Sequence, residues 1–289
     1  MNIEELHYIA VIGGGQMGRQ IALNTAIHGY DVNITDTFPN MLENVEQWCS
    51  KYLASRVEKG RMTQEEADAA HKRFHVIPVL ADTVKNTQLV IEAIIEDKGE
   101  KAELFRQLNV LVPKNTVLVT NSSYIVSSSF TNCVNNPSRL ANFHYFNPAL
   151  VLKLVEVVQG SHTSNETIDF LMEFARRTGK TPIRVNKEID GFVVNRIMRA
   201  MRDMAYSLVE EGVCTPQEID LGVELGLNHP MGPFRLNDLT GIDSTYYQNE
   251  RRLKETGTPP PGYNIVKAKF EAHEWGRKTG KGFYEYPNN

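Results

Sequence analysis

The sequence predicts an α/β protein in two parts, a doubly wound sheet domain over residues 1–187 and a smaller all-α domain over residues 188–289. At the N-terminus, a strand, a glycine-rich turn, a helix and a second strand follow one another. Further apolar runs then alternate with helical patterns as far as Val185. From Gly191 onward one helical pattern follows another, and no strand-like run returns before the tail.

The composition is typical of a soluble globular enzyme. Hydrophobic residues make up 41% and charged residues 23% of the 289 residues. The net charge of −4, from 31 basic and 35 acidic residues, gives no electrostatic reason to expect nucleic acid or a membrane surface as a partner. The N-terminus carries acids where a signal peptide needs bases, and no apolar run is long enough to span a bilayer.

The three cysteines, Cys49, Cys133 and Cys214, are widely spaced and form no metal-binding pattern. Reduced thiols are usual in the cytosol. We therefore expect a cytoplasmic protein without a metal site.

The N-terminal elements have the order of a dinucleotide-binding unit. Residues 8–13 form an apolar strand, a helical pattern follows up to Ile27, and residues 31–36 form the second strand. Between the first strand and the helix lies a GxGxxG sequence, residues 13–18. Such a sequence is a weak signal alone, but a position after a strand and before a helix is what a Rossmann-like fold requires.

Each glycine of this turn has a physical role. Gly13 permits the tight turn, Gly15 lets the backbone approach a pyrophosphate, and Gly18 lets the helix pack close to the strand. Gln16 and Met17 lie between these glycines, where the helix N-terminus presents N–H groups and a positive dipole end to phosphates. We expect all five residues to belong to the cofactor site.

Asp36 selects the cofactor. It ends the second strand, and its carboxylate should accept hydrogen bonds from the adenosine ribose hydroxyls. A carboxylate there would repel a 2′-phosphate, and no Arg or Lys follows in the next few residues. The sequence therefore predicts NAD in preference to NADP.

Two additional helices, residues 41–59 and 63–72, exceed what a minimal nucleotide-binding unit needs. Thr63-Gln-Glu-Glu66 has the form of a capping box at the start of the second. Arg56, Lys59 and Arg61 form a basic cluster near the junction, although charges at a helix end are more often simply solvated.

Polar residues follow the later strands at their carboxyl ends, where ligands bind in open α/β sheets. Residues 89–96 and 116–123 are predicted strands, separated by a helix over residues 97–111. An ordinary loop role is as plausible for any one of the polar residues, but their shared location favours a site. These residues are Glu96, Asn121, Ser122, Ser123 and His144.

His144 and Glu156 are predicted to form a general base with its orienting carboxylate. His144 ends one apolar run, and Glu156 lies on a second run, residues 152–158, after the turn residues Asn147-Pro148. Adjacent strands can bring the two side chains together, and a carboxylate then fixes the imidazole tautomer. A hairpin with a core His and a solvated Glu would be the commoner meaning of this pair alone, but the dinucleotide signature favours catalysis.

The chain closes its first domain with a helix over residues 165–178 and a strand over residues 181–185. An amphipathic helix over residues 191–211 follows, and Thr215 is expected to cap the next helix. So small an all-α domain cannot easily bury all these apolar faces alone.

Ordered motifs extend this pattern over nearly the whole chain: residues 13–18, 91–96, 121–123, 144–156, 191–196, 230–234 and 276–284. With them the chain resembles the 3-hydroxyacyl-CoA dehydrogenase family, NAD-dependent enzymes of fatty acid β-oxidation and 3-hydroxybutyryl-CoA metabolism. The resemblance implies an acyl-CoA substrate, an NAD cofactor and a homodimer formed through the helical domain.

The resemblance also implies roles for single residues. His144 would take the proton of the substrate 3-hydroxyl, Glu156 would orient it, and Ser123 and Asn195 would bind the substrate. Lys59, or Arg61 if the helix register differs, would contact CoA. The residues that would contact or border NAD are Glu96, Lys101, Ser123, Asn147 and Lys278.

The chain departs from the family pattern at Tyr124, where a serine is usual, at Arg202-Asp203, where an Asn-Glu pair is typical, and at Arg235, which replaces an acid. These positions fall where the acyl tail or the partner subunit is expected. Two enzyme hypotheses follow: a dehydrogenase of short or unusual L-3-hydroxyacyl-CoA substrates, and a relative acting on a free 3-hydroxy acid such as carnitine or a sugar acid. The retained catalytic set argues against a third, a catalytically dead NAD-binding protein.

Overall fold

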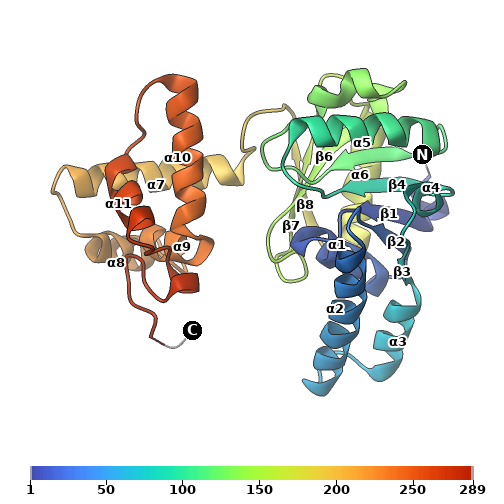
Figure 1. Ribbon diagram of the computed structural model, residues 1–289, viewed down its shortest axis with the longest axis horizontal. Coiled ribbons are helices and arrows are strands. Elements are labelled where there is room, and N and C mark those ends of the chain that lie inside the picture. The colour runs from blue at the N-terminus through green and yellow to red at the C-terminus, as the bar shows by residue number, and fades with distance from the viewer. Residues whose placement is uncertain (1, 288–289) are drawn as a thin grey trace. The chain divides into compact units, whose positions relative to one another are not determined.

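The computed structural model describes residues 2–287 and divides into two compact units, residues 1–193 and residues 194–289 (Figure 1). The first unit is an α/β domain and the second is helical, which confirms the predicted fold class. The division by contacts falls after Val193, beyond the expected boundary at residue 187.

The first unit contains one sheet of eight strands in the order β3-β2-β1-β4-β5-β6-β7-β8. All neighbouring strands are parallel except β6 and β7, which are antiparallel. The strands are β1 (Tyr8–Ile12), β2 (Asp31–Thr35), β3 (Phe74–Val76), β4 (Leu89–Glu92), β5 (Val117–Thr120), β6 (Leu140–Tyr145), β7 (Leu154–Val158) and β8 (Thr181–Val185).

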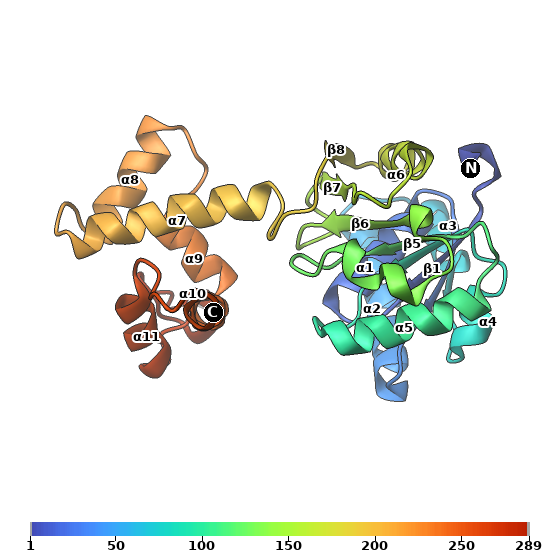
Figure 2. The same cartoon turned by 90° about the horizontal axis from the view of Figure 1, so that it is seen from above.

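Helices cover both faces of this sheet, as a doubly wound fold requires (Figure 2). Alternate residues of β1 show the two faces: Ile9 and Val11 join one apolar cluster with α1 and α6, whereas Ala10 and Ile12 join another with α5. The helices are α1 (Gln16–Ile27), α2 (Pro39–Glu58), α3 (Gln64–Lys72), α4 (Leu80–Val84), α5 (Lys98–Leu111) and α6 (Asn165–Arg177), with 3₁₀ turns η1 (Ile3–Glu5), η2 (Ser127–Cys133) and η3 (Pro137–Arg139).

Several local signals in the sequence correspond to observed structure. The capping box at Thr63 and Glu66 is formed, and Asp97 caps α5 through its side chain. Strand β4 stops at Glu92, earlier than the expected end at residue 96. The Ala93 N–H still donates to the Ile12 carbonyl oxygen, but residues 93–96 are not part of a strand. Strand β3 and helix α4 were not predicted, since each is too short to show a periodic pattern.

The second unit is built from helices α7 (Val194–Glu210), α8 (Pro216–Gly226), α9 (Pro233–Thr240), α10 (Ile242–Thr256) and α11 (Tyr263–Glu271), with a 3₁₀ turn η4 (Arg277–Thr279). Its core contains Tyr206, Phe234 and Val266. Helix α7 begins at Val194, later than expected, because Gly191 and Phe192 both have positive φ angles. Over residues 2–287 no helix combines the length and the apolar character needed to cross a membrane.

Candidate active site

Parallel strands bring the predicted site residues of the first unit to one edge of the sheet. The carboxyl ends of β1, β4, β5 and β6 lie side by side there, because these strands are hydrogen-bonded neighbours in register. The glycine turn follows β1, residues 93–96 follow β4, and residues 121–123 follow β5. His144 lies near the end of β6. Asn121 Oδ1 accepts a hydrogen bond from the Tyr145 N–H at 2.9 Å, which ties two of these segments together.

His144 lies between a serine hydroxyl and a buried carboxylate. In the antiparallel pair β6–β7, His144 is directly opposite Glu156, and its Nδ1 is 2.8 Å from Glu156 Oε2. Glu156 is fully buried and His144 is 3% exposed. Ser123 Oγ is 2.9 Å from His144 Nε2. A carboxylate on Nδ1 makes that nitrogen the donor, so Nε2 is left to accept a proton from the side where Ser123 lies.

Residues that the sequence reasoning did not single out complete this pair. The backbone N–H of Val193 donates to Glu156 Oε1 at 3.0 Å. The rings of Phe146 and Phe192 pack on the imidazole, with centroids 4.6 Å and 5.5 Å from it. Phe192 is buried and has φ of 46°, a conformation that costs a bulky residue about 1–3 kcal/mol. The preceding Gly191 gave a weak sequence signal for such a turn.

The glycine turn fits a dinucleotide pyrophosphate. A Cβ on Gly13 would lie 2.5 Å from the Ala93 carbonyl oxygen, and a Cβ on Gly18 would lie 1.8 Å from the Gly13 carbonyl oxygen, so the backbone packs too closely for side chains. A Cβ on Gly15 would meet no heavy atom of the described residues within 4 Å. Gly15 is also the N-cap of α1 and makes no side-chain cap, so no capping side chain competes with a phosphate for the first N–H groups of the helix.

Asp36 directly follows β2 and lies beside this turn. Its Oδ2 accepts a hydrogen bond from the Gly14 N–H at 2.7 Å, and its Oδ1 accepts one from the Phe38 N–H at 3.0 Å. These bonds hold the carboxylate at the end of the strand, and each oxygen retains a lone pair for a ribose hydroxyl.

The connection between β6 and β7 contacts the glycine turn. Gln16 Nε2 donates to Asn147 Oδ1 at 3.1 Å, which joins two residues predicted for the cofactor site. Lys180 holds this connection in place, because its Nζ donates to the carbonyl oxygens of Ala149 and Leu152. The sequence did not predict this role. Nothing in the local sequence marks Lys180 as buried.

Lys101 lies behind the site. It is 1% exposed, and its Nζ is 2.5 Å from Glu92 Oε1 and 3.4 Å from Glu96 Oε2. Burial raises the pKa of Glu92, while Lys101, Thr120 and the Ile94 N–H oppose that rise. Glu96 is more exposed and also accepts a hydrogen bond from Ser122. Lys101 is thus the counter-ion of a buried carboxylate, and Glu96 is the member of this group that faces outward.

Four of the remaining predicted residues lie elsewhere in the fold. Lys59 caps the C-terminus of α2, and Arg61 follows it at the tip of the α2–α3 hairpin, where both are exposed (Figure 1). Asn195 is the second residue of α7 in the helical unit. Lys278 belongs to η4 of the same unit and forms an ion pair with Asp243.

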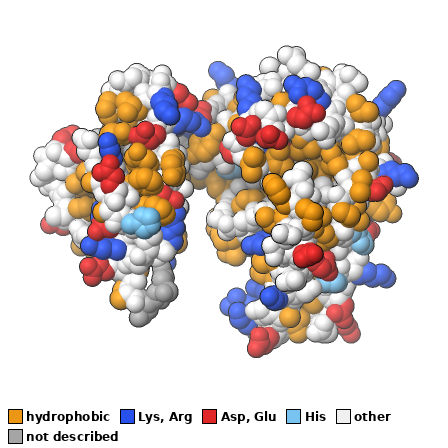
Figure 3. All heavy atoms as spheres, in the orientation of Figure 1, with side chains coloured by type: hydrophobic (Ala, Val, Ile, Leu, Met, Phe, Trp, Pro, Cys, Tyr) orange, Lys and Arg blue, Asp and Glu red, His pale blue; other side chains and the backbone are white. Residues whose placement is uncertain are grey.

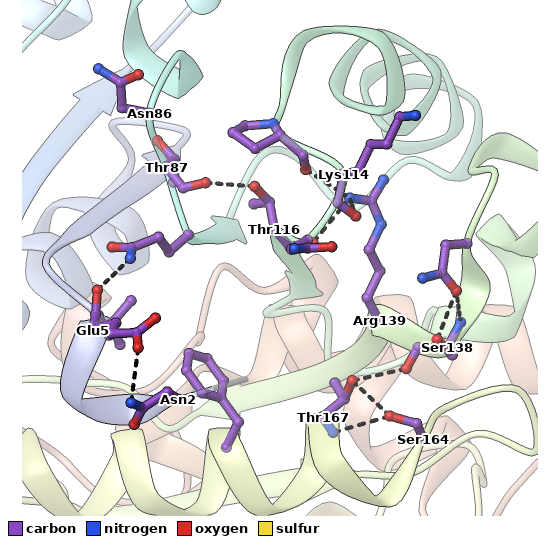
Figure 4. A pocket seen from close by; sticks show the side chains of 16 residues that line it. Asn2, Glu5, Asn86, Thr87, Lys114, Thr116, Ser138, Arg139, Ser164 and Thr167 are labelled. Carbon is purple, nitrogen blue, oxygen red and sulfur yellow. Dashed lines mark hydrogen bonds between the residues drawn. The ribbon is translucent and has the colours of Figure 1, made fainter.

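A separate cavity of about 530 Å³ is lined by 16 residues, none of which is a predicted site residue (Figure 4). Its lining includes residues 86–88, which precede β4, residues 113–116, which precede β5, and Arg139, which precedes β6. It therefore lies at the amino edge of the sheet, opposite the edge where His144 lies. Arg139 Nη1 donates there to three carbonyl oxygens, which is a structural role.

Two family models together match almost all of the chain. The model of the 3-hydroxyacyl-CoA dehydrogenase NAD binding domain matches residues 8–189. The model of the 3-hydroxyacyl-CoA dehydrogenase C-terminal domain matches residues 191–286. The chain belongs to the 3-hydroxyacyl-CoA dehydrogenase family. As a member of this family it is an NAD-dependent oxidoreductase.

Relatives of this family member agree over its length. It is 36% identical to a probable 3-hydroxybutyryl-CoA dehydrogenase of Bacillus subtilis over 285 residues, covering 98% of each chain. It is 39% identical to a 3-hydroxyadipyl-CoA dehydrogenase of Escherichia coli over 289 residues, covering 96% of this chain and 58% of the relative. Its structure is similar to that of (S)-3-hydroxybutyryl-CoA dehydrogenase from Ralstonia eutropha, with a TM-score of 0.89, 31% identity and coverage of 98% and 99%.

Proposed function

We propose that this chain oxidises an L-3-hydroxyacyl-CoA of short acyl chain, such as 3-hydroxybutyryl-CoA, to the 3-oxoacyl-CoA, and catalyses the reverse reaction. The observation that carries the proposal is the continuous chain of contacts Ser123–His144–Glu156 at the carboxyl edge of the sheet. A protein that only binds NAD has no use for a carboxylate-oriented base. A spectrophotometric assay with acetoacetyl-CoA and NADH tests the proposal, and absence of NADH oxidation would refute it.

His144 moves the proton in this proposal. In the oxidative direction Nε2 takes the proton of the substrate 3-hydroxyl, and buried Glu156 stabilises the resulting imidazolium. In the reductive direction the imidazolium returns that proton to the substrate oxygen. The Ser123 hydroxyl, 2.9 Å from Nε2, is placed to hold the same oxygen, and Asn195 is proposed as a second hydrogen-bonding partner of the substrate.

NAD, when bound, accepts the hydride from carbon 3 of the substrate. The glycine turn would hold its pyrophosphate, and Asp36 would hold the ribose hydroxyls, since both fit these groups in the structure. The other residues that we propose to contact or border the cofactor are Gln16, Met17, Glu96, Lys101, Ser123, Asn147 and Lys278.

A pair of glycine variants tests the pyrophosphate position. Gly15→Ala should fold with unchanged thermal stability, because its Cβ meets no protein atom and its φ of −63° suits alanine. It should weaken NADH binding by about tenfold or more, equivalent to the loss of one charge-assisted hydrogen bond. Gly18→Ala should lower both stability and binding, because its Cβ would overlap the Gly13 carbonyl. Thermal unfolding and NADH fluorescence titration measure these effects, and normal NADH binding by Gly15→Ala would place the pyrophosphate elsewhere.

The basic residues at the tip of the α2–α3 hairpin are proposed to contact a phosphate of CoA. Replacing Lys59 and Arg61 together with Ala should raise the KM for acetoacetyl-CoA by about fivefold or more, equivalent to roughly 1 kcal/mol. Both side chains are exposed, so folding should be unaffected. Steady-state kinetics at several salt concentrations measure the effect, which should shrink as salt rises. An unchanged KM would remove these residues from the CoA site.

An alternative substrate is a free 3-hydroxy acid, which has no CoA phosphate to recognise. Tyr124 directly follows Ser123, the proposed partner of the substrate oxygen. Its bulky side chain would narrow the space beside that oxygen, which favours a substrate with an unusual acyl group. Turnover of acetoacetate and acetoacetyl-CoA, compared in wild type and in the Lys59/Arg61 variant, separates the two. Only the CoA thioester should respond to the loss of the basic residues.

A homodimer belongs to the same proposal. Apolar side chains reach the surface of the helical unit (Figure 3). Ile197 and Met204 lie seven positions apart on α7, and Leu221 and Leu225 lie four apart on α8, with exposed fractions of 54–78%. Each pair forms an apolar face that a second copy could cover. Light scattering that gave only the 32.7 kDa monomer would contradict the dimer.

A further inference from the structure

The segment between β8 and α7, residues 186–193, is anchored near its start by Glu188. Glu188 Oε1 accepts a hydrogen bond from Ser127 Oγ at 2.7 Å and another from the backbone N–H of Ser128 at 2.9 Å. Ser127 is buried, and its own backbone N–H donates to Asn142 Oδ1 at 2.7 Å. Asn142 lies in β6 two residues before His144. The anchor therefore connects the segment to the strand that carries the proposed base.

The same segment ends on the catalytic pair. The Val193 N–H donates to Glu156 Oε1 at 3.0 Å, and the Phe192 ring lies 5.5 Å from the His144 ring. Phe192 packs in a small apolar cluster with Val126, the residue before Ser127. Its φ of 46° is a conformation that a large residue keeps only when the surrounding contacts enforce it. Contacts at both ends of the turn supply that enforcement.

The anchor also involves a histidine, but it does not form a hydrolytic triad. His162 Nε2 lies 3.2 Å from Ser127 Oγ, yet Glu188 binds that same hydroxyl and does not orient the imidazole. A triad needs the carboxylate on the far side of the histidine and an accessible hydroxyl. Ser127 is only 1% exposed. The Glu188 carboxylate oxygen instead accepts two hydrogen bonds and holds the turn of residues 186–193 in place.

We propose that Glu188 is a positioning residue for the dehydrogenase reaction. It would act through the turn, by keeping the Val193 N–H on Glu156 and the Phe192 ring against His144. The inference rests on the proposed role of His144 as the base. The positioning depends on an accepting oxygen at residue 188 and not on its charge, since the Ser127 hydroxyl and the Ser128 N–H that donate to it are neutral.

Substitutions of Glu188 in the full-length chain test this inference. Glu188→Ala should lower kcat by about 10- to 100-fold, the size of effect that a displacement near 1 Å of a catalytic group produces, and leave the KM for NADH unchanged. Glu188→Gln keeps an accepting oxygen and should recover most of kcat. Lys187→Ala is the matched control, because Lys187 is exposed in the same segment, and it should behave as wild type. Thermal unfolding confirms that each variant is folded.

A proton NMR readout separates positioning from a general loss of stability. The His144 Nδ1–H that is bonded to Glu156 should give a low-field resonance, identified by its loss in His144→Gln. Glu188→Ala should shift or broaden this resonance, and Glu188→Gln should restore it. The inference is overturned if Glu188→Ala matches Lys187→Ala in kcat and in this resonance. It is also overturned if the Ala and Gln variants lose kcat equally while the resonance stays in place.

The turnover of His144→Gln tests the proposed function separately from the role of Glu188. If His144→Gln retains wild-type turnover, the assignment of His144 fails, whatever the Glu188 variants do. If His144→Gln is inactive while Glu188→Ala is fully active, only the positioning role of Glu188 fails.

Discussion

Replacing His144 with Gln should lower kcat by about 10²- to 10⁴-fold, the usual contribution of a general base. Gln is similar in size and can keep a hydrogen bond to Glu156, so the fold and the nearby glycine turn should be undisturbed. NADH binding should therefore stay nearly the same, because the glycine turn and Asp36, which we propose to hold NAD, lie on other segments of the edge. Stopped-flow or steady-state assays with acetoacetyl-CoA and NADH, together with NADH titration, give the two quantities.

Glu156→Gln is the companion variant. It removes the charge beside Nδ1 and keeps one oxygen, which can accept from Nδ1 or from the Val193 N–H but not from both, since these donors bind different oxygens of Glu156. The loss of turnover should be largest in the reductive direction, where the histidine must start as imidazolium and the carboxylate stabilises that charge. If His144→Gln kept wild-type turnover, His144 would have no role in the mechanism.

Replacing Lys101 with Met should lower the free energy of unfolding by about 3–5 kcal/mol, the usual cost of leaving a buried charge without its partner. Lys101 and Glu92 are both at most 1% exposed and lie 2.5 Å apart. Without the cation, burial should raise the pKa of Glu92 further, because the ionised form loses its counter-charge. Urea unfolding followed by circular dichroism measures the loss.

The pH dependence of this loss has a defined sign. A carboxyl group whose pKa is raised in the folded state binds protons more tightly there than in the unfolded chain. The penalty in Lys101→Met should therefore be small below the ordinary Glu value of 4.5 and grow as the pH rises towards the raised folded value. Combining Lys101→Met with Glu92→Gln should restore much of the stability, since the Gln oxygen can accept from the Ile94 N–H and its NH₂ group can donate to the Thr120 hydroxyl. If Lys101→Met instead unfolds like wild type but binds NADH poorly, Lys101 acts on the cofactor directly.

The contact between His144 and Glu156 could be predicted from the sequence because it depends on local signals. Two apolar runs separated by Asn147-Pro148 imply neighbouring strands, and the observed register sets His144 opposite Glu156. The glycine turn was equally accessible, because its residues must meet backbone constraints that only glycine satisfies. In both cases the context of the surrounding strands and helix, and not the spacing alone, supported the prediction.

The contacts of other residues near the proposed site could not be predicted in the same way. Lys101 reads as a helical surface lysine, and only the packing of α5 against β4 buries it beside Glu92. Glu188 and Ser127 are far apart in the chain and meet only in the folded protein. Phe192 resembles a core residue of the following helix, and its positive φ appears only once the turn is built. Such tertiary contacts leave no periodic trace in a single sequence.

The antiparallel pairing of β6 with β7 has a consequence for how this family member can vary. Side chains alternate between the faces of a strand, so a slip of one residue in this pairing would carry the carboxylate to the opposite surface and leave the imidazole alone. The ladder, and not the connecting loop, therefore fixes the distance between the two groups. Insertions in residues 146–153 can reshape the neighbourhood of the proposed cofactor site without changing the contact between His144 and Glu156, provided the ladder keeps its alignment.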